Sequence, residues 1–193
     1  MSKEKLYFVI NKPFKVLSQF TPEHDKKHLG DFYNFPKDVY SLGRLDEDSE
    51  GLLVLTNDKY LKTQAMNSDI KVQKTYWVFV EGKVTDEAIE KLRRGVDIAV
   101  KGQHYHTQAA EVERLVNPKI FDREPTILKP GEWLEIKISE GKYRQVRKMT
   151  AAVGHPTLRL VRVGYGDLTL GDLKPGACVM LSKKVIYKKI LGI

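Results

Sequence analysis

The 193-residue sequence contains a single cysteine, Cys178, and no long apolar run. One cysteine excludes an intramolecular disulfide and a cysteine-based metal cluster. No stretch approaches the roughly 18 apolar residues of a membrane span. Only five apolar residues follow the charged amino terminus, which is too few for a signal peptide. We therefore expect a protein of the reducing cytoplasm with no membrane partner.

The sequence also lacks repeats, low-complexity tracts and the glycine-rich loops that hold nucleotide phosphates. Positive charge, in contrast, is abundant: 33 Lys and Arg residues stand against 25 Asp and Glu residues, for a formal net charge of +8. No amphipathic basic helix is expected at either end, so the charge favours nucleic acid over acidic lipid as the partner. A merely soluble basic protein is the alternative, and the positions of the charges must decide.

Hydrophobic periodicity predicts an α+β protein whose sheet is mixed but largely antiparallel. The predicted strands are 6–10, 16–20 (pairing back on the first), 52–56, 75–81, 96–100, 109–116, 133–138, 157–163, 178–182 and 185–190. The predicted helices are 59–66 after an Asn57-Asp58 cap, 85–95 ending at Gly95, and 143–153 closed by Gly154. Residues 117–131 read as an irregular surface segment. We expect one domain over 1–193, or a small lobe over about 1–66 and a larger one over 67–193.

The most informative segment is 43–58, which reads GRLDEDSEGLLVLTND. A glycine turn presents Arg44 and Asp46, an acidic loop follows, and an apolar run then enters a core. This pattern holds a carboxylate at a surface with a cation beside it, which favours chemistry on a polyanion. An Arg–Asp pair that only braces a turn is the structural alternative.

A second segment, Lys74-Thr75-Tyr76, begins a predicted strand. Because strand side chains alternate, Lys74 and Tyr76 point to one face. A cation beside a phenol ring can hold a phosphate and stack a base. An amphipathic strand edge with no ligand is the alternative.

A third segment, 140–149, reads EGKYRQVRKM and opens a predicted helix. Tyr143 and Val146 have core spacing, and Arg144, Arg147 and Lys148 share a neighbouring face. Three cations on one face repel one another, so the arrangement favours an anionic partner over solvated charge.

Metal sites are poorly supported. The acidic string from Asp46 imitates the start of a calcium loop, but position 12 of that pattern is Asn57 rather than glutamate. His104 and His106 could share a strand face, yet no third ligand follows at metal-site spacing. No metal and no cofactor are expected.

Taken in this order, the segments resemble the pseudouridine synthases of the bacterial group that modifies ribosomal RNA, most closely its E-type large-subunit members. Two further segments match, Asn11-Lys12-Pro13 with 16–20, and 156–162. The resemblance implies the pseudouridine synthase fold, with a sheet flanked by helices and a central active-site cleft. It implies isomerisation of uridine to pseudouridine in RNA, most simply 23S rRNA. Because this reaction oxidises and hydrolyses nothing, it needs no cofactor, and we expect a monomer because the enzyme must grip a large RNA.

The resemblance also implies roles at matching positions. Asp46 is the catalytic carboxylate, Tyr76 stacks on the target uracil and can take the C5 proton, and Arg147 pairs with the carboxylate. Arg44 matches an arginine that helps to extrude the target base. The implied RNA-backbone contacts are Lys12, Lys74, Arg144 and Lys148.

Two departures from the family pattern stand out. The catalytic pattern begins within ten residues of the first residue, so we do not expect the small RNA-binding domain that most members carry first; the E type also lacks it. Lys142-Tyr143 replaces the Arg-Asn that is usual there. A synthase acting on transfer RNA, or a non-catalytic RNA-binding ribosome-assembly factor, remains as an alternative.

Overall fold

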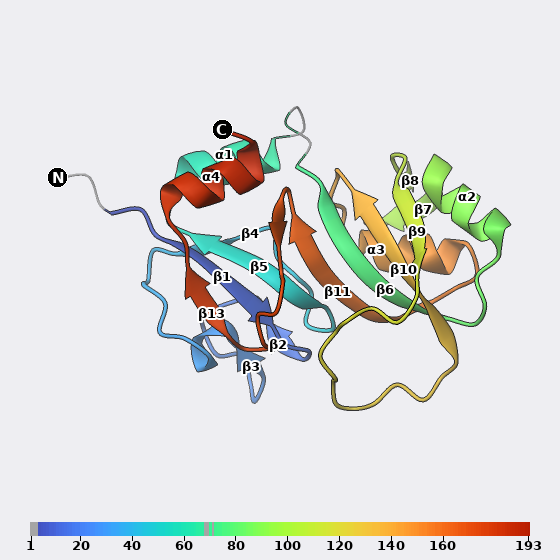
Figure 1. The fold of residues 1–193 in the computed structure, drawn as a ribbon, viewed down its shortest axis with the longest axis horizontal. Helices are drawn as coiled ribbons and strands as arrows, with labels where there is room; N and C mark the ends of the chain where they lie inside the picture. Colours follow the sequence, from blue (N-terminus) through green and yellow to red (C-terminus); the bar gives the residue numbers. More distant parts are fainter. Residues whose placement is uncertain (1–3, 68–69, 71) are drawn as a thin grey trace. The chain divides into compact units, whose positions relative to one another are not determined.

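A computed structural model describes residues 4–67, 70 and 72–193, which form two compact units (Figure 1). Unit 1 comprises Met1–Val72 and Arg162–Ile193, and unit 2 comprises Gln73–Val161. The expected lobe division placed all of 67–193 in the larger lobe, whereas the last 32 residues (193 − 162 + 1) return to unit 1. Sequence order could not show this return, because it follows from strand pairing.

Unit 1 is built on the antiparallel pair β1 (Tyr7–Lys12) and β5 (Glu50–Thr56), in register from Tyr7↔Thr56 to Lys12↔Gly51. Every residue of both strands is buried, because both faces of the pair are covered. An aromatic cluster of Phe8, Tyr33 and Phe35 packs together within 5.4 Å between ring centroids. Unit 1 also contains the strands β4 (Tyr40–Leu42), β12 (Leu168–Thr169) and β13 (Cys178–Met180). A short parallel pair, β2 (Val16–Leu17) with β3 (Lys27–His28), and the 3₁₀ turn η1 (Leu29–Asp31) complete the unit's first half.

Helices α1 (Lys59–Met66) and α4 (Lys183–Leu191) lie side by side in unit 1 (Figure 1). Their apolar residues Leu61, Ala65, Ile186 and Ile190 share one core cluster with Tyr7 and other residues of the sheet. The 185–190 segment was predicted as a strand, and this prediction is wrong. Its apolar residues Ile186 and Ile190 recur at a spacing of four, which is that of a helix.

Asp58 caps α1 and also joins it to the sheet and to α4. Its carboxylate accepts hydrogen bonds from the amides of Tyr60 and Leu61 and from the hydroxyls of Tyr7 and Tyr187, the last two at 2.7 Å. Burial alone would raise the pKa of Asp58, but the hydrogen bonds outweigh it and hold the pKa below its ordinary value of 3.8. One buried carboxylate therefore organises the helical face of unit 1.

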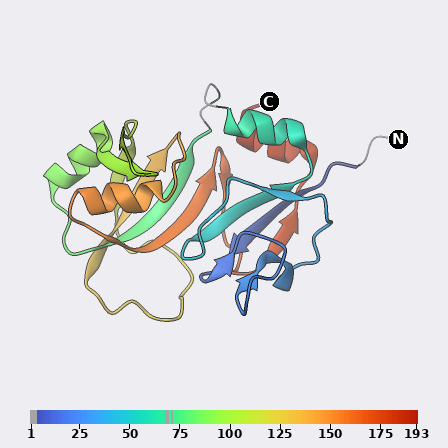
Figure 2. The same ribbon diagram turned by 180° about the vertical axis from the view of Figure 1, so that it is seen from behind.

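Unit 2 contains the antiparallel strands β6 (Lys74–Glu81), β10 (Gly131–Ile138) and β9 (Glu111–Leu115). Its helices α2 (Asp86–Arg94) and α3 (Gln145–Ala152) contribute to the same core as the even-numbered residues of β6, so both cover one face (Figure 2). A hairpin of β7 (Asp97–Val100) and β8 (Gln103–His106) packs beside α3. Strand β11 (Thr157–Tyr165) begins in unit 2 and ends in unit 1.

The predicted α+β class with a largely antiparallel sheet is confirmed, as are the helices at 59–66 and 85–95 with their caps. The irregular segment 117–131 is also confirmed up to the start of β10. Two predictions are wrong besides α4. Residues 16–20 do not pair with the first strand, since Val16 and Leu17 pair in parallel with Lys27 and His28. The third helix begins at Gln145 rather than at 143, because Arg144 adopts a left-handed conformation with φ of 53°.

Replacement of Asp58 by alanine should lower the free energy of unfolding by about 3 kcal/mol, because a helix cap and two hydrogen bonds to a charged group are lost together. Thr85→Ala, which removes only a cap bond of α2, is the matched control and should cost about 1 kcal/mol. Chemical denaturation measures both, and equal losses would contradict the joining role of Asp58.

Because the pKa of Asp58 is depressed in the folded state, its contribution is complete above 3.8 and disappears as the pH falls through the lower, folded-state value. The stability difference between wild type and Asp58→Asn should therefore shrink between pH 5 and about pH 2. A difference that stays constant over this range would contradict the assignment.

Candidate active site

The turn that begins at Gly43 is held through its backbone. Gly43 has a φ of +66°, a conformation that glycine adopts without strain. The hydroxyl of Ser18 donates to the carbonyl of Leu45 at 2.6 Å and accepts its amide at 3.2 Å. The amide of Ser49 donates to the carbonyl of Asp46 at 3.1 Å, which closes the turn. The backbone on both sides of Asp46 is therefore fixed by hydrogen bonds.

Arg162 is a component of this turn that the sequence interpretation missed. Its side chain is buried, with 2% of its surface exposed, and its guanidinium donates to the carbonyls of Leu52 at 2.8 Å and Gly43 at 3.1 Å. The guanidinium also lies 5.4 Å from the ring centroid of Tyr165. A cation inside the otherwise apolar run 160–165 was the signal, because buried charge persists only where it is hydrogen-bonded.

Lys12 was predicted to contact RNA, and the structure contradicts this. Its side chain has 0% exposure, and its ammonium donates to the carbonyls of Pro13 at 3.0 Å and Val16 at 2.6 Å, with a longer contact to that of Glu47. Burial lowers the pKa of Lys12 to about 8, against the opposing influence of nearby carboxylates, Glu50 foremost. Lys12 therefore connects the 13–16 turn to the acidic loop and is not available to a phosphate.

These anchors leave the side chains of Arg44 and Asp46 accessible. Leu45 is buried, Asp46 is half-buried and Arg44 is exposed. The predicted arrangement, a carboxylate and a cation presented at a surface by a rigid turn, is present in unit 1. The apolar run that follows is β5, so a calcium loop is not formed here.

In unit 2, Tyr76 lies in β6 opposite Ile136 of β10 and packs against the core that includes Val146 and Met149 of α3. Its ring is half-buried, so part of it can meet a ligand. Lys74 begins the same strand, two residues away and on the same face as Tyr76, and is also half-buried.

The loop before α3 is organised by Glu140. Its carboxylate accepts hydrogen bonds from the hydroxyl of Tyr105, the amide of Gln108 at 2.8 Å and the side chain of Gln145 at 2.6 Å. The bond to Glu140, together with burial, raises the pKa of Tyr105 to about 12. The side chain of Gln145 also accepts the amide of Lys142 at 2.9 Å, which closes the loop on itself.

This loop changes the expected roles of its neighbours. Tyr143 was predicted in the core but precedes the helix and is 64% exposed. Arg144, in its left-handed conformation, lies outside the helical face that it was expected to share with the other cations. The ammonium of Lys148 donates to the carbonyl of Ala99 at 2.6 Å and lies over the ring of Tyr143. Arg147, in the first turn of α3, is half-buried, and its guanidinium donates to the carbonyl of Thr157 at 3.5 Å.

The predicted catalytic residues thus come from both units. Asp46 and Arg44 belong to unit 1, and Tyr76, Arg147 and the remaining predicted RNA contacts belong to unit 2. Within each unit the predicted residues lie on well-anchored backbone. The pairing of Arg147 with Asp46 stays a prediction.

The two histidines of β8 do lie on one face, where His104 and His106 both contact the carboxylate of Asp97, at 3.3 and 2.7 Å. In the part of the chain that the structure describes, no group of three or more His, Cys, Asp or Glu side chains is placed to hold a metal ion. Burial raises the pKa of the Cys178 thiol to about 11, so this thiol is a poor nucleophile at neutral pH. None of the described helices is long and apolar enough to cross a membrane.

Comparison with known proteins places these observations in one group. The sequence profile of the family described as RNA pseudouridylate synthase matches residues 6–152. Ribosomal large subunit pseudouridine synthase E of Vibrio parahaemolyticus is 48% identical over 172 residues, covering 87% of this chain and 70% of that protein. The protein of the same name from Xanthomonas axonopodis is 47% identical, covering 86% of this chain and 89% of that protein.

Two solved structures of pseudouridylate synthases are also similar to this chain. A pseudouridylate synthase crystal structure has a TM-score of 0.79 at 28% identity and covers 98% of this chain and 75% of that chain. Human RNA Pseudouridylate Synthase Domain Containing 1 has a TM-score of 0.58 at 16% identity, covering 94% of this chain and 81% of that chain, which supports the fold alone.

The anchoring role of Lys12 predicts that Lys12→Met, which keeps the stem and removes the donor, lowers the free energy of unfolding by about 2 kcal/mol, because buried carbonyls lose their partner. Lys5→Met, at an exposed position of the same unit, should change it by less than about 0.5 kcal/mol. Urea denaturation measures both variants. A Lys12→Met protein as stable as the control would show that the three carbonyl contacts contribute nothing.

Proposed function

Since this chain belongs to the RNA pseudouridylate synthase family, we propose that it isomerises one uridine of 23S ribosomal RNA to pseudouridine with Asp46 as the catalytic carboxylate. The predicted pseudouridine synthase fold is confirmed by the solved relatives. The choice of large-subunit RNA is supported by four relatives, 44–48% identical, that carry the name ribosomal large subunit pseudouridine synthase E. The observation that carries the role of Asp46 is the backbone-anchored turn that presents it.

The reaction breaks the bond between N1 of uracil and C1′ of ribose, turns the base, and forms a bond between C5 and C1′. The hydrogen leaves C5 and N1 gains one, so nothing is oxidised and no water is consumed. A carboxylate must act on the ribose, either as the nucleophile at C1′ or as the base that removes the proton from C2′. The half-buried Asp46 suits either route.

A preorganised carboxylate is valuable here because a misplacement of 1 Å can cost about a hundredfold in rate. Ser18 fixes Leu45 on one side of Asp46, and Ser49 bonds to the carbonyl of Asp46 itself. Arg162 fixes the carbonyl of Gly43 at the start of the turn. The position of the catalytic backbone is thus set before RNA binds.

Tyr76 supplies the ring that retains the detached uracil. One part of its ring packs on the unit 2 core, and the half-exposed remainder is free to stack on a base. Its hydroxyl is the candidate acceptor of the C5 proton. Arg147 is proposed to pair with Asp46 in the assembled site and keep it ionised.

The target base must leave its stack, at a cost of a few kcal/mol. The exposed Arg44, on the same rigid turn as Asp46, is proposed to enter the space that the base vacates. Lys74 and Arg144, with a smaller part for Lys148, contact the flanking phosphates. Lys12 has no part in this, since its ammonium is buried among carbonyls.

The two units are proposed to form one catalytic domain, acting as a cytoplasmic monomer without a cofactor. A transfer-RNA substrate is the second candidate, since the motifs are shared by synthases of different RNAs. The relatives' names favour ribosomal RNA. A purely RNA-binding role is less well supported, because the carboxylate of Asp46 would repel the RNA phosphates and would contribute nothing to binding.

Deletion of the gene should remove one pseudouridine from 23S rRNA, and wild type but not Asp46→Asn should restore it. Asp48→Asn, which removes the same charge from the same loop, should also restore it. Single-site pseudouridine mapping of total RNA gives the readout. Loss of a site in transfer RNA would support the second candidate, and full restoration by Asp46→Asn would refute catalysis by this residue.

Substitutions of Tyr76 separate stacking from proton transfer. Tyr76→Phe keeps the ring, so KM for an rRNA transcript should be unchanged while kcat falls by about a hundredfold, the usual worth of a positioned acid–base group. Tyr76→Leu should lower kcat further and raise KM, because the ring is lost. Tyr143→Phe, at an exposed tyrosine of unit 2, is the control. An unchanged kcat for Tyr76→Phe would exclude its hydroxyl as the proton acceptor.

A further inference from the structure

The helical face of unit 1 has an unusual charge pattern. Helices α1 and α4 together carry six lysines, two in α1 and four in α4, and neither contains an acidic residue. All six side chains are exposed. They are Lys59, Lys62, Lys183, Lys184, Lys188 and Lys189. With Tyr60 and Tyr187 they make up what we call the α1–α4 surface.

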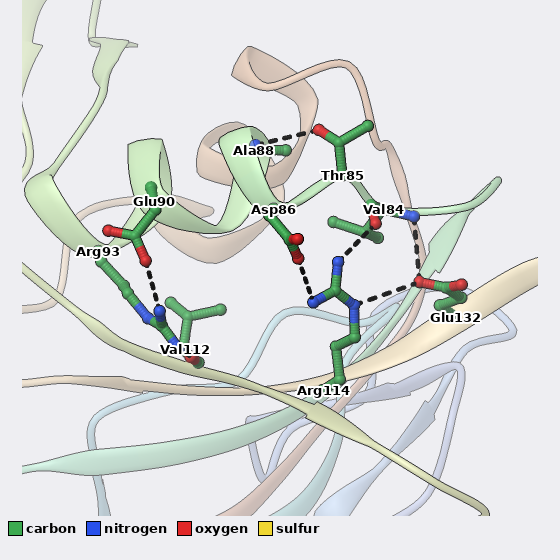
Figure 3. A network of polar contacts seen from close by, with 9 residues as sticks. All are labelled: Val84, Thr85, Asp86, Ala88, Glu90, Arg93, Val112, Arg114 and Glu132. Atoms are coloured by element: carbon green, nitrogen blue, oxygen red, sulfur yellow. Dashed lines mark hydrogen bonds and ion pairs between the residues drawn. The ribbon is translucent and has the colours of Figure 1, made fainter.

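Several exposed cations of unit 2 have acidic partners. Lys91 pairs with Glu87 at 2.7 Å and Lys129 with Glu81 at 2.9 Å. Figure 3 shows two examples at helix α2. Arg93 of this helix pairs with Glu90, and Arg114 of β9 pairs with Asp86. Each arginine also donates to a backbone carbonyl. Among the residues that the structure describes, none of the six lysines of the α1–α4 surface forms an ion pair with a carboxylate.

Helix electrostatics oppose part of this arrangement. Lys183 and Lys184 occupy the first turn of α4, where the helix dipole favours negative charge. Lys184 and Lys188 are four residues apart and repel each other along one side of the helix. Lys188 and Lys189 lie in the last turn, where the dipole favours cations, so helix stability does not explain the placement of Lys183 and Lys184.

The surface also offers an aromatic ring among the cations. Tyr60 is 55% exposed and stacks on Tyr187, with ring centroids 6.1 Å apart and planes 13° from parallel. The ammonium of Lys183 lies 4.9 Å from the ring centroid of Tyr187. The carboxylate of Asp58, the N-cap of α1, is buried and accepts hydrogen bonds from the hydroxyls of Tyr7 and Tyr187. Cations interleaved with stacked aromatic rings are typical of surfaces that bind nucleic acid.

An acidic lipid surface fits less well. The apolar residues Ile186 and Ile190 of α4 are buried in the unit 1 core with Leu61 of α1. A helix that lies in a membrane interface needs its apolar face free to enter the lipid. Here the apolar face packs in the core of unit 1, so only the side that carries the lysines is exposed.

We propose that the α1–α4 surface binds the phosphate backbone of an RNA segment outside the uridine that is modified, and so serves as a second RNA contact of the enzyme. This rests on the proposed RNA substrate but not on the role of Asp46. The prediction that no basic helix stands at either end of the chain was wrong, and the missed helix α4 supplies four of the six cations.

The test replaces Lys59, Lys184 and Lys188 together by glutamine in the full-length protein. None of these three has an aromatic or hydrogen-bonding contact through its side chain among the described residues, so folding should be preserved, and thermal unfolding checks this. Affinity for transcribed 23S rRNA is measured over a series of salt concentrations. We expect at least a tenfold loss of affinity, and a salt slope reduced by about 1 for each lysine that meets a phosphate.

The matched control is Lys83→Gln, Lys91→Gln and Lys129→Gln, which removes the same charge from exposed positions of unit 2. The proposal requires this control to keep both its affinity and its salt slope. Equal losses in the two triple variants would show that only bulk charge matters and would overturn it. Unchanged RNA binding by the first variant would also overturn the proposal. If that variant instead loses binding to phosphatidylserine vesicles, the surface binds acidic lipid and not RNA.

The two proposals fail in different ways. Asp46→Asn should abolish turnover without weakening RNA binding. If this variant still turns over, only the proposed catalytic role of Asp46 is refuted. The lysine variants are scored on binding and salt slope, which need no turnover. A protein that binds through the α1–α4 surface but modifies no uridine would refute the proposed function and leave this inference standing.

Discussion

The hydrogen bonds that hold the 43–49 turn are the constraint on which the rest of this protein depends. Ser18, Arg162 and Lys12 reach the turn and its neighbouring strand from distant parts of the sequence, and each binds backbone atoms rather than the side chain of Asp46. The backbone position of Asp46 is therefore set by contacts that do not involve its carboxylate. Buried polar side chains serve this purpose because leaving any of their partners unsatisfied costs about 1–3 kcal/mol.

Cations in this chain divide into two kinds by burial. Lys12 and Arg162 are buried, and their side chains donate to backbone carbonyls. Arg44 and the lysines of the α1–α4 surface are exposed, and among the described residues none of these lysines forms an ion pair with a carboxylate. The formal net charge counts buried and exposed cations alike and does not distinguish them. Cations that are not fully buried can contribute to an affinity for RNA, and some of the exposed ones lie where sequence motifs gave no indication.

Elements whose local signals agree with their tertiary surroundings were predictable. The helix after Asp58 has its cap, and the strand 75–81 has its alternation. Prediction failed where a contact outside the segment decided the outcome. Leu17 pairs with His28 rather than with the first strand, and Tyr143 is exposed because Glu140 and Gln145 fold the preceding loop and delay the helix. Helix α4 was missed because its short apolar run satisfies a strand period as readily as a helical one.

The sequence by itself determined the family, because several motifs occur in a fixed order, and the resemblance to that family predicts the roles of Asp46, Tyr76 and Arg147. Tertiary structure alone decided which polar residues anchor and which remain available. It buried Lys12, recruited Arg162 to the turn, and brought the C-terminal helix beside α1. The physical reason is that a motif specifies local chemistry, whereas burial and hydrogen-bond partners depend on segments more than a hundred residues apart, such as Gly43 and Arg162.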